Sequence, residues 1–421
     1  VPDLPISFLQ ADTAEKLWES LDEQCVNTDK GCDVIVIPHN SNLSDSQMFL
    51  HTKDDGSPID KAYAERIQRF ERLVEVMQHK GSSECFFGPG AMEDELCDFE
   101  QLPYDKFSGK FSSFLRKKPE ANDGFLRQVM NEGLQEQELT GVNPFKWGFI
   151  ASTDTHLGAP GAVDERNFPG HGGAGEPATG AVPKGLPDDL EFNPGGLAVL
   201  WAEENSRESL FSAMRRREAY GTSGPRITVR FFGGWDMPDS LCSQSDLVET
   251  GYRQGVPMGS DLPRAGGTTE KPVFVVSALK DAGTAETRGM DLQRIQIIKG
   301  WLDSSGTGHQ KVFEVAGDPD NGASVDINTC RTQGQGFSQL CSVWHDKEFD
   351  PGQSAWYYAR VVENPTCRWS QQICAANNVD CAVPSSIKEG LEACCSDSHR
   401  PVIQERAWTS PIWYTPASSS P

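Results

Sequence analysis

Four residues of the kinds that bind catalytic metal ions lie at or beside short apolar runs of this sequence: His39, Glu75, Asp154 and His156. A carboxylate inside an apolar run, such as Glu75, is costly to bury unless it is paired or bound to a metal. In an extended segment, Asp-x-His directs both side chains to the same side, so both can reach one ion. Taken singly, each residue also fits a structural role: a surface His, a salt-bridged Glu or an Asp that caps a helix. Together they predict a metal site.

The elements that would position these residues alternate along the first half of the chain. The apolar runs have the length of buried parallel strands, and we expect strands at 33–37, 72–77, 147–152 and 196–201. Amphipathic or helix-rich segments stand between them, at 13–21, 61–70, 122–139 and 207–218. This alternation predicts βα units and a parallel sheet or barrel, in which strand carboxyl ends converge on one mouth.

The pattern changes after residue 224. Strand-like runs separated by Gly, Asp and Ser turns follow, which predicts a β-rich, Cys-containing domain over 225–421, after an α/β domain over 1–224. Within the first domain, the Gly/Pro-rich stretch 158–195 is interpreted as a long loop over the site.

The amino-acid composition limits the classes of binding partner and the cellular compartment of the protein. A formal net charge of −23 argues against nucleic acid as a partner, and no apolar run is long enough to predict a transmembrane segment. Twelve cysteines without any Cys-x-x-Cys pair favour disulfides over a zinc site, although free buried thiols remain the alternative. We therefore expect a secreted or periplasmic protein whose disulfide connectivity the sequence does not reveal.

The segments around the four residues resemble a known family. Ile37-Pro38-His39-Asn40, Val74-Glu75-Val76 and Ser152-Thr153-Asp154-Thr155-His156 are similar to the later motifs of the PHP (polymerase and histidinol phosphatase) superfamily, in particular to a bacterial branch of large secreted proteins. The resemblance covers about residues 1–226. It implies an α/β fold, the C-terminal part of a distorted (β/α)7 barrel, with His39, Glu75, Asp154 and His156 as ligands of Zn, Mn or Fe.

One family motif is missing from this chain. The superfamily opens with His-x-His, and none of the eight histidines here forms that motif. The resemblance therefore implies that a companion N-terminal polypeptide of the same precursor supplies the remaining ligands for two or three ions. A fragment and a degenerate site are the alternatives that stay open.

Further residues could act on an anionic ester substrate. Lys80 could steady an oxyanion and His171 could protonate a leaving group, although both also fit solvated surface positions. The substrate-binding candidates are polar residues near the strand ends or flanking a Gly/Ser segment: Asn40, Asn42, Glu84, Arg217 and Arg226. The two arginines could grip phosphate or sulfate bidentately, or form ordinary salt bridges.

The predicted function is a metal-dependent hydrolase of phosphate or sulfate esters, in which a metal-activated water attacks the ester. The alternative is a non-catalytic structural or binding component that retains a degenerate barrel. A carbohydrate-binding role for the C-terminal domain is a third option.

Overall fold

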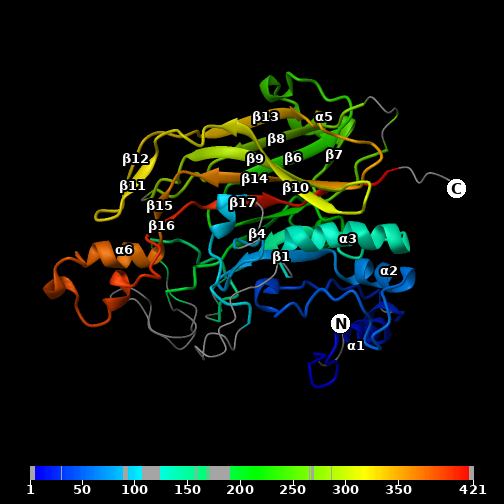
Figure 1. The fold of residues 1–421 in the computed structure, drawn as a ribbon. Helices are drawn as coiled ribbons and strands as arrows, with labels where there is room; N and C mark the ends of the chain where they lie inside the picture. Colours follow the sequence, from blue (N-terminus) through cyan, green and yellow to red (C-terminus); the bar gives the residue numbers. More distant parts are fainter. Residues whose placement is uncertain are drawn as a thin grey trace.

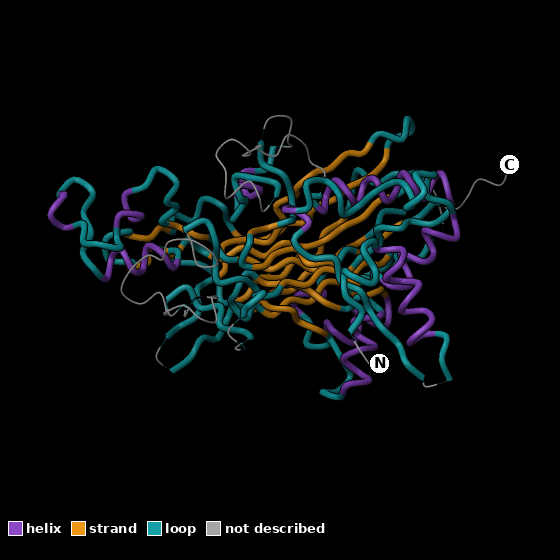
Figure 2. Tube along the Cα trace, turned by 90° about the horizontal axis from the view of Figure 1, so that it is seen from below, coloured by secondary structure: helices purple, strands orange, loops and turns teal. Residues whose placement is uncertain are grey.

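The structure is a computed structural model that describes residues 5–29, 31–88, 93–106, 124–156, 158, 160–166, 168, 170, 190–264, 266, 270–285 and 287–416. Its centre consists of two stacked β-sheets, with helix α3 and a small third sheet against the outer face of one of them (Figure 1). Seen from below, the strands gather in the middle of the molecule (Figure 2).

The largest sheet is antiparallel throughout. Its order is β10 (Gly308–Gly317), β9 (Leu292–Leu302), β14 (Ala355–Glu363), β17 (Arg406–Thr409), β5 (Ala219–Thr222) and β4 (Leu197–Leu200), and β18 (Ile412–Tyr414) pairs with the start of β14. Every residue of β14 is buried, because this central strand is covered on both faces. Since β17 pairs with β5, the boundary expected at residue 224 falls inside one continuous sheet.

The second sheet covers one face of the first. It consists of β13 (Gln339–His345), β8 (Val273–Leu279), β6 (Thr228–Gly234) and β7 (Gly255–Pro257). Alternate residues of its strands face the core, as period-2 patterning requires. The core between the two sheets includes Val229, Phe231, Phe274, Val276, Ile295, Ile297, Tyr357 and Ala359.

Helix α3 (Leu126–Thr140) packs on the opposite face of the large sheet. Leu126, Val129, Met130 and Leu134 recur at helical spacing and are buried against Trp356 and Tyr358 of β14. Each such side chain contributes roughly 1.5–3 kcal/mol through its burial. The helix ends at Gly141, whose positive φ of 82° forms a left-handed cap that a glycine adopts without strain.

The same layer holds the small sheet β2-β1-β3, which is made of β1 (Leu73–Gln78), β2 (Gly81–Ser82) and β3 (Gly148–Ala151). Strands β1 and β3 are parallel, with Leu73 opposite Gly148, so their carboxyl ends lie together. Both strands were expected from the sequence, and their existence is confirmed.

The expected strand at 33–37 is wrong. This segment is extended beside β1 but makes no ladder: Val36 N donates to Phe70 O, and Pro38 O accepts from Glu75 N. Proline has no N–H to donate, which limits regular pairing at the end of this segment.

The remaining elements lie around these layers. The helices are α1 (Ala14–Leu21), α2 (Lys61–Phe70), α4 (Arg207–Arg215), α5 (Leu247–Gln254) and α6 (Trp369–Ala376). Two short antiparallel strand pairs, β11 (Ser324–Asp326) with β12 (Arg331–Gln333) and β15 (Thr366–Cys367) with β16 (Val402–Ile403), lie beside α6 (Figure 1). Helices α1 and α4 are capped at their N-termini, since the Thr13 and Ser206 side chains accept from backbone N–H groups.

The (β/α)7 barrel expected from the sequence is wrong. In the described part of the chain, sheets dominate, none closes into a barrel, and the strand pair β4–β5, which α4 connects, is antiparallel. The physical reason is that a short apolar run between polar loops looks the same whether its neighbour is parallel or antiparallel. Among the strands that the structure describes, only β1 and β3 keep the expected parallel pairing.

The expected disulfides are confirmed. All twelve cysteines are paired: Cys25–Cys32, Cys85–Cys97, Cys242–Cys341, Cys330–Cys367, Cys374–Cys394 and Cys381–Cys395. Disulfides persist in oxidising compartments, so they are consistent with a secreted protein.

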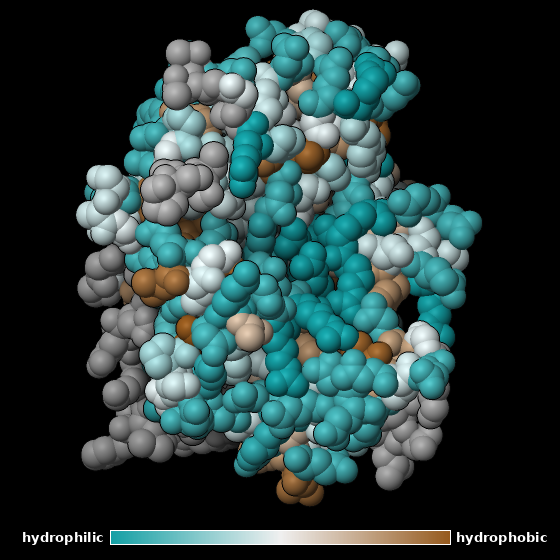
Figure 3. Space-filling model, turned by 90° about the vertical axis from the view of Figure 1, so that its right-hand side faces the viewer, coloured by the Kyte–Doolittle hydropathy of each residue, from teal (hydrophilic) through white to brown (hydrophobic). Residues whose placement is uncertain are grey.

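The surface agrees with the acidic composition. The face at the right of Figure 1 is largely hydrophilic, with small separate apolar patches (Figure 3). Among the described helices, none has the length and apolar character needed to cross a bilayer.

Candidate functional site

Glu75 is the best-defined member of the candidate site. It lies in β1, 5% exposed, beside the carboxyl end of β3. Ser152 donates its hydroxyl to Glu75 Oε1, and Asn40 N donates to Oε2 at 3.2 Å. Burial raises the pKa of Glu75 to about 7; these two hydrogen bonds offset part of the rise, and the nearby Asp154 adds to it. This carboxyl group can therefore gain or lose its proton near neutral pH.

The extended segment before Ser41 brings His39 to the same place. Asn40 adopts a left-handed conformation with φ 57°, which asparagine tolerates better than most residues. Its backbone N–H reaches Glu75, and its side-chain Nδ2 lies 3.4 Å from His39 Nδ1. His39 is exposed, and it directly precedes the residue whose backbone N–H binds the buried Glu75 carboxyl group.

Asp154 follows β3 and is held by the last residue of β1 and by the two residues after it. Its Oδ2 accepts from Gln78 Nε2 at 3.1 Å, pairs with Lys80 Nζ and lies 3.3 Å from His79 Nε2. Burial alone would raise the pKa of Asp154, but the bonds from His79 and Lys80 outweigh it and hold the pKa well below its ordinary value. Asp154 also has a positive φ of 50°, a mildly strained conformation of the kind that clusters at functional sites.

His156 lies farther along the same edge. Its ring centroid is 6.5 Å from that of His79, with the planes at 72°. His79 is fully buried and also packs on Phe192, at 5.4 Å between centroids. The backbone around Asn193 packs against His79, since Asn193 N donates to His79 O.

Sequence reasoning missed His79 and Ser152 as members of the site. Both contact the candidate ligands directly. Their position in the sequence could have identified them, because each lies in the polar cluster that directly follows a strand.

Two other predicted residues serve the structure around the site. Asn42 is buried and donates to Lys80 O at 3.0 Å, while Ser83 donates to its Oδ1, so it positions the loop that carries Lys80. Glu84 points into the core instead and binds Arg127, at 2.6 Å, and Arg360, at 3.0 Å. Burial would raise the pKa of Glu84, but the two arginines lower it to about 2.

The remaining predicted residues are not brought to this edge by any described contact. Arg217 is buried at the amino end of β3, where its guanidinium donates to Lys146 O and Gly259 O. Arg226 is exposed beyond the end of β5. His171 lies outside the described residues.

Comparison with known proteins gives one match. A family model described as a protein of unknown function (DUF3604) matches residues 2–416. The chain belongs to the DUF3604 family. No curated protein and no solved structure matches it. The family description names no activity, so the function of this DUF3604 chain has to be argued from the site itself.

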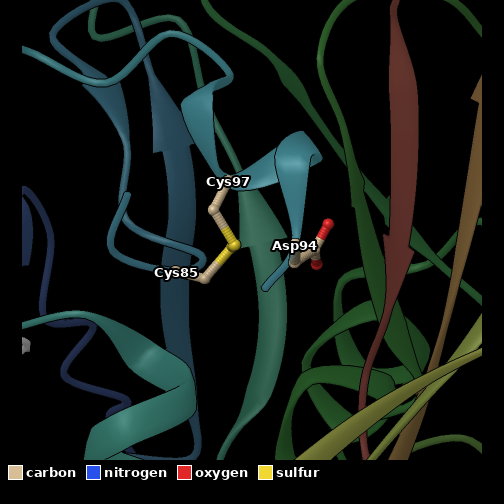
Figure 4. Close-up of side chains that lie close together, drawn as sticks. All are labelled: Cys85, Asp94 and Cys97. Carbon is tan, nitrogen blue, oxygen red and sulfur yellow. A yellow bond between two sulfur atoms is a disulfide. The ribbon is translucent and has the colours of Figure 1, made fainter. Parts of the chain in front are cut away.

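The residue types of the DUF3604 site suit a divalent transition metal, since imidazole and carboxylate ligands bind Zn, Mn and Fe. Their ligand atoms are not gathered, however. Within the described ranges, the one set of three potential ligand atoms that all lie within 4.8 Å of one another is Cys85, Asp94 and Cys97. Figure 4 shows that its two sulfur atoms are joined in a disulfide, so this set is not a metal site.

The candidate site therefore suits a metal ion through its residue types and through their position at one edge of the small sheet. Glu75 is a buried carboxyl group whose two hydrogen bonds come from neutral donors. Asp154 is ionised but carries the Lys80 ammonium as its cation. A metal ion would satisfy both carboxylates, with His39 and His156 alongside, if Glu75 loses its proton and Lys80 moves.

Proposed function

We propose that the edge formed by β1, β3 and the segment before Ser41 is the site of a metal-dependent hydrolase of phosphate or sulfate esters. The observation that supports the proposal best is the buried Glu75, placed between Asn40 and Ser152 and within electrostatic reach of Asp154. Two acidic groups brought together at strand ends, one of them buried, form an expensive arrangement that a bound cation would relieve.

In this proposal His39, Glu75, Asp154 and His156 hold Zn, Mn or Fe, and a companion polypeptide completes the ligand set for a second or third ion. The bound metal would supply Lewis acidity and a water of lowered pKa. The resemblance to the PHP superfamily motifs supports the same ligand assignment.

The chain's own residues have defined tasks. Glu75 has to release its proton, which its pKa of about 7 allows near neutral pH. Lys80, once displaced from Asp154, would be a free ammonium beside the site and could steady the negative charge of the ester oxygens. His79 is buried against Asp154 and would keep that carboxylate oriented.

An assay with aryl phosphate and aryl sulfate esters tests the proposal. The protein, isolated together with its companion polypeptide and supplied with Zn, Mn or Fe, should hydrolyse at least one ester class. Glu75→Gln and Asp154→Asn should each lower kcat/KM by about 100-fold or more, because loss even of a group that only orients a ligand costs about 10- to 100-fold. Glu71→Gln is the matched control, because Glu71 is equally buried at the opposite end of β1. No hydrolysis under any metal, or equal rates for all variants, would refute the proposal.

A specific observation favours a second candidate, a non-catalytic binding or structural component. Lys80 already neutralises Asp154, and the four ligand atoms are not gathered. An ion pair of this kind needs no metal. In this case metal would neither bind tightly nor change stability, and the ester assay would give no turnover.

A further inference from the structure

A second region of the molecule carries chemistry that the ester-hydrolase proposal does not use. A cavity of about 930 Å³ lies where β14 ends and β17 begins. Its volume is typical of pockets for small organic ligands.

Two glutamates stand side by side in this cavity. Glu363 N donates to Glu405 O at 2.8 Å, next to the ladder pair Val362 and Arg406. Directly opposite residues of an antiparallel pair project to the same face, so the two carboxyl groups are neighbours. They are only 3% and 6% exposed, and Glu165, which is 9% exposed, lines the same cavity.

The two carboxyl groups lack a cationic partner within the described part of the chain. Glu363 Oε1 is buried and makes no hydrogen bond, and Glu405 accepts only from the neutral hydroxyl of Ser223. Three of the cations that act on these groups electrostatically are paired with other acids: Lys280 with Asp291, Arg166 with Asp164 and Arg368 with Glu100. Buried Arg406 also acts on Glu405, but its guanidinium donates to the backbone carbonyls of Leu96 and Gln404.

This arrangement is poor for stability. Two carboxylates directly opposite each other in a sheet would repel if both were ionised, and a buried acceptor without a donor carries an uncompensated cost. Burial raises the pKa of both carboxyl groups. Asp281 adds to the rise at Glu363, and Glu363 adds to the rise at Glu405. A hydrogen-bonding cation inside the cavity would relieve both costs.

The shape of the site argues for an organic cation over a metal ion. Glu165, Glu363 and Glu405 do not form a set of ligand atoms within 4.8 Å, in a search of the described residues, so they offer no compact metal cage. The exposed guanidinium groups of Arg226 and Arg288 also line the cavity, and they favour an anionic group at the outer end of the ligand.

We propose that this cavity binds a small zwitterionic ligand, with an ammonium or guanidinium group against Glu363 and Glu405 and an anionic group at Arg226. The site is independent of ester hydrolysis at Glu75, so either can fail without the other.

Isothermal titration calorimetry with three matched probes tests the proposal. L-Arginine carries both kinds of charge, agmatine lacks the carboxylate, and N-acetyl-L-citrulline keeps the carboxylate but carries neither an ammonium nor a guanidinium group. Arginine should bind most tightly, agmatine about 10-fold or more weakly because it loses a charged hydrogen bond, and N-acetyl-citrulline should show no measurable binding. Absence of binding by both cationic probes, or binding of N-acetyl-citrulline as tight as that of arginine, would overturn the proposal.

Variants assign the two ends of the ligand. Glu363→Gln and Glu405→Gln should each weaken arginine and agmatine alike, whereas Arg226→Gln should weaken arginine and leave agmatine unchanged. Glu71→Gln, outside the cavity, is the control and should bind as the wild type does. Melting curves of every variant check that it is folded. If Arg226→Gln affects both probes equally, the assignment of the anionic end is refuted; if neither Gln variant at Glu363 or Glu405 weakens binding, the site itself is refuted.

Discussion

Replacing Glu75 by Gln distinguishes a metal ligand from a structural carboxyl group. Burial raises the pKa of Glu75 to about 7 from an ordinary value of 4.5. The metal-free folded chain therefore keeps a proton that the unfolded chain has lost between these two pH values. The stability that this proton contributes is present below the unfolded pKa, and it is lost as the pH rises through the folded pKa.

The size of the effect follows from the two pKa values. At about pH 8 the metal-free Glu75→Gln variant should be more stable than the wild type by about 3 kcal/mol, which corresponds to the interval from 4.5 to about 7. At about pH 4, where both states of the wild type are protonated, this advantage should disappear.

Divalent metal should reverse the order of stability. A ligand that binds only the folded state at 100 times its Kd adds about 2.7 kcal/mol. If Glu75 is a ligand, metal binding stabilises the wild type by this amount and does not stabilise Glu75→Gln. Urea unfolding followed by tryptophan fluorescence, in chelator and in Zn, Mn or Fe, measures both effects.

The matched control is Glu71→Gln. Glu71 is also buried, and burial raises its pKa to about 8, but it lies at the other end of β1. This variant should be stabilised at about pH 8 and should still gain stability from metal as the wild type does. The reasoning is refuted if Glu75→Gln is the less stable protein in chelator, or if metal stabilises both variants equally.

Three further predictions test individual contacts of the structure. Glu84→Gln should lower the free energy of unfolding by about 3–5 kcal/mol, because it removes one of the two buried carboxylates that neutralise Arg127 and Arg360 and leaves only Asp94 between them, and urea denaturation measures this. Replacing both Cys242 and Cys341 by Ser opens a loop with a sequence separation of 99 residues and should cost about 4–5 kcal/mol, seen as a lower urea midpoint under non-reducing conditions. Lys80→Met should raise the pKa of Asp154 toward its ordinary value, and carboxyl NMR titration of the wild type and the variant would show no difference if the ion pair does not form.

The sequence predicts the site's strands well and their assembly poorly. The apolar runs that become β1 and β3 are confirmed, as are the polar clusters at their ends, because period and flanking residues are local properties. Strand direction is not local. The partner of β5 is β17, which comes more than 180 residues later, and no pattern within β5 specifies it.

The same limit applies to side chains. Glu84 follows β1 at a position suited to a site residue, but its partners Arg127 and Arg360 are 43 and 276 residues away in the chain. Disulfides were predictable from cysteine number and spacing, whereas the six pairings depend on which elements meet in space. Glu363 and Glu405 were not noticed as a pair, because only the register of β14 and β17 brings them together.

Metal content per chain tests the central claim most directly. Plasma mass spectrometry should be run on the wild-type protein and on Glu75→Gln and Asp154→Asn after equilibration with Zn, Mn or Fe and removal of free metal. The proposal predicts at least one tightly bound equivalent in the wild type, and its loss in both variants. No retained metal in the wild type, or the same content in all three proteins, would contradict a metal-dependent hydrolase at this edge.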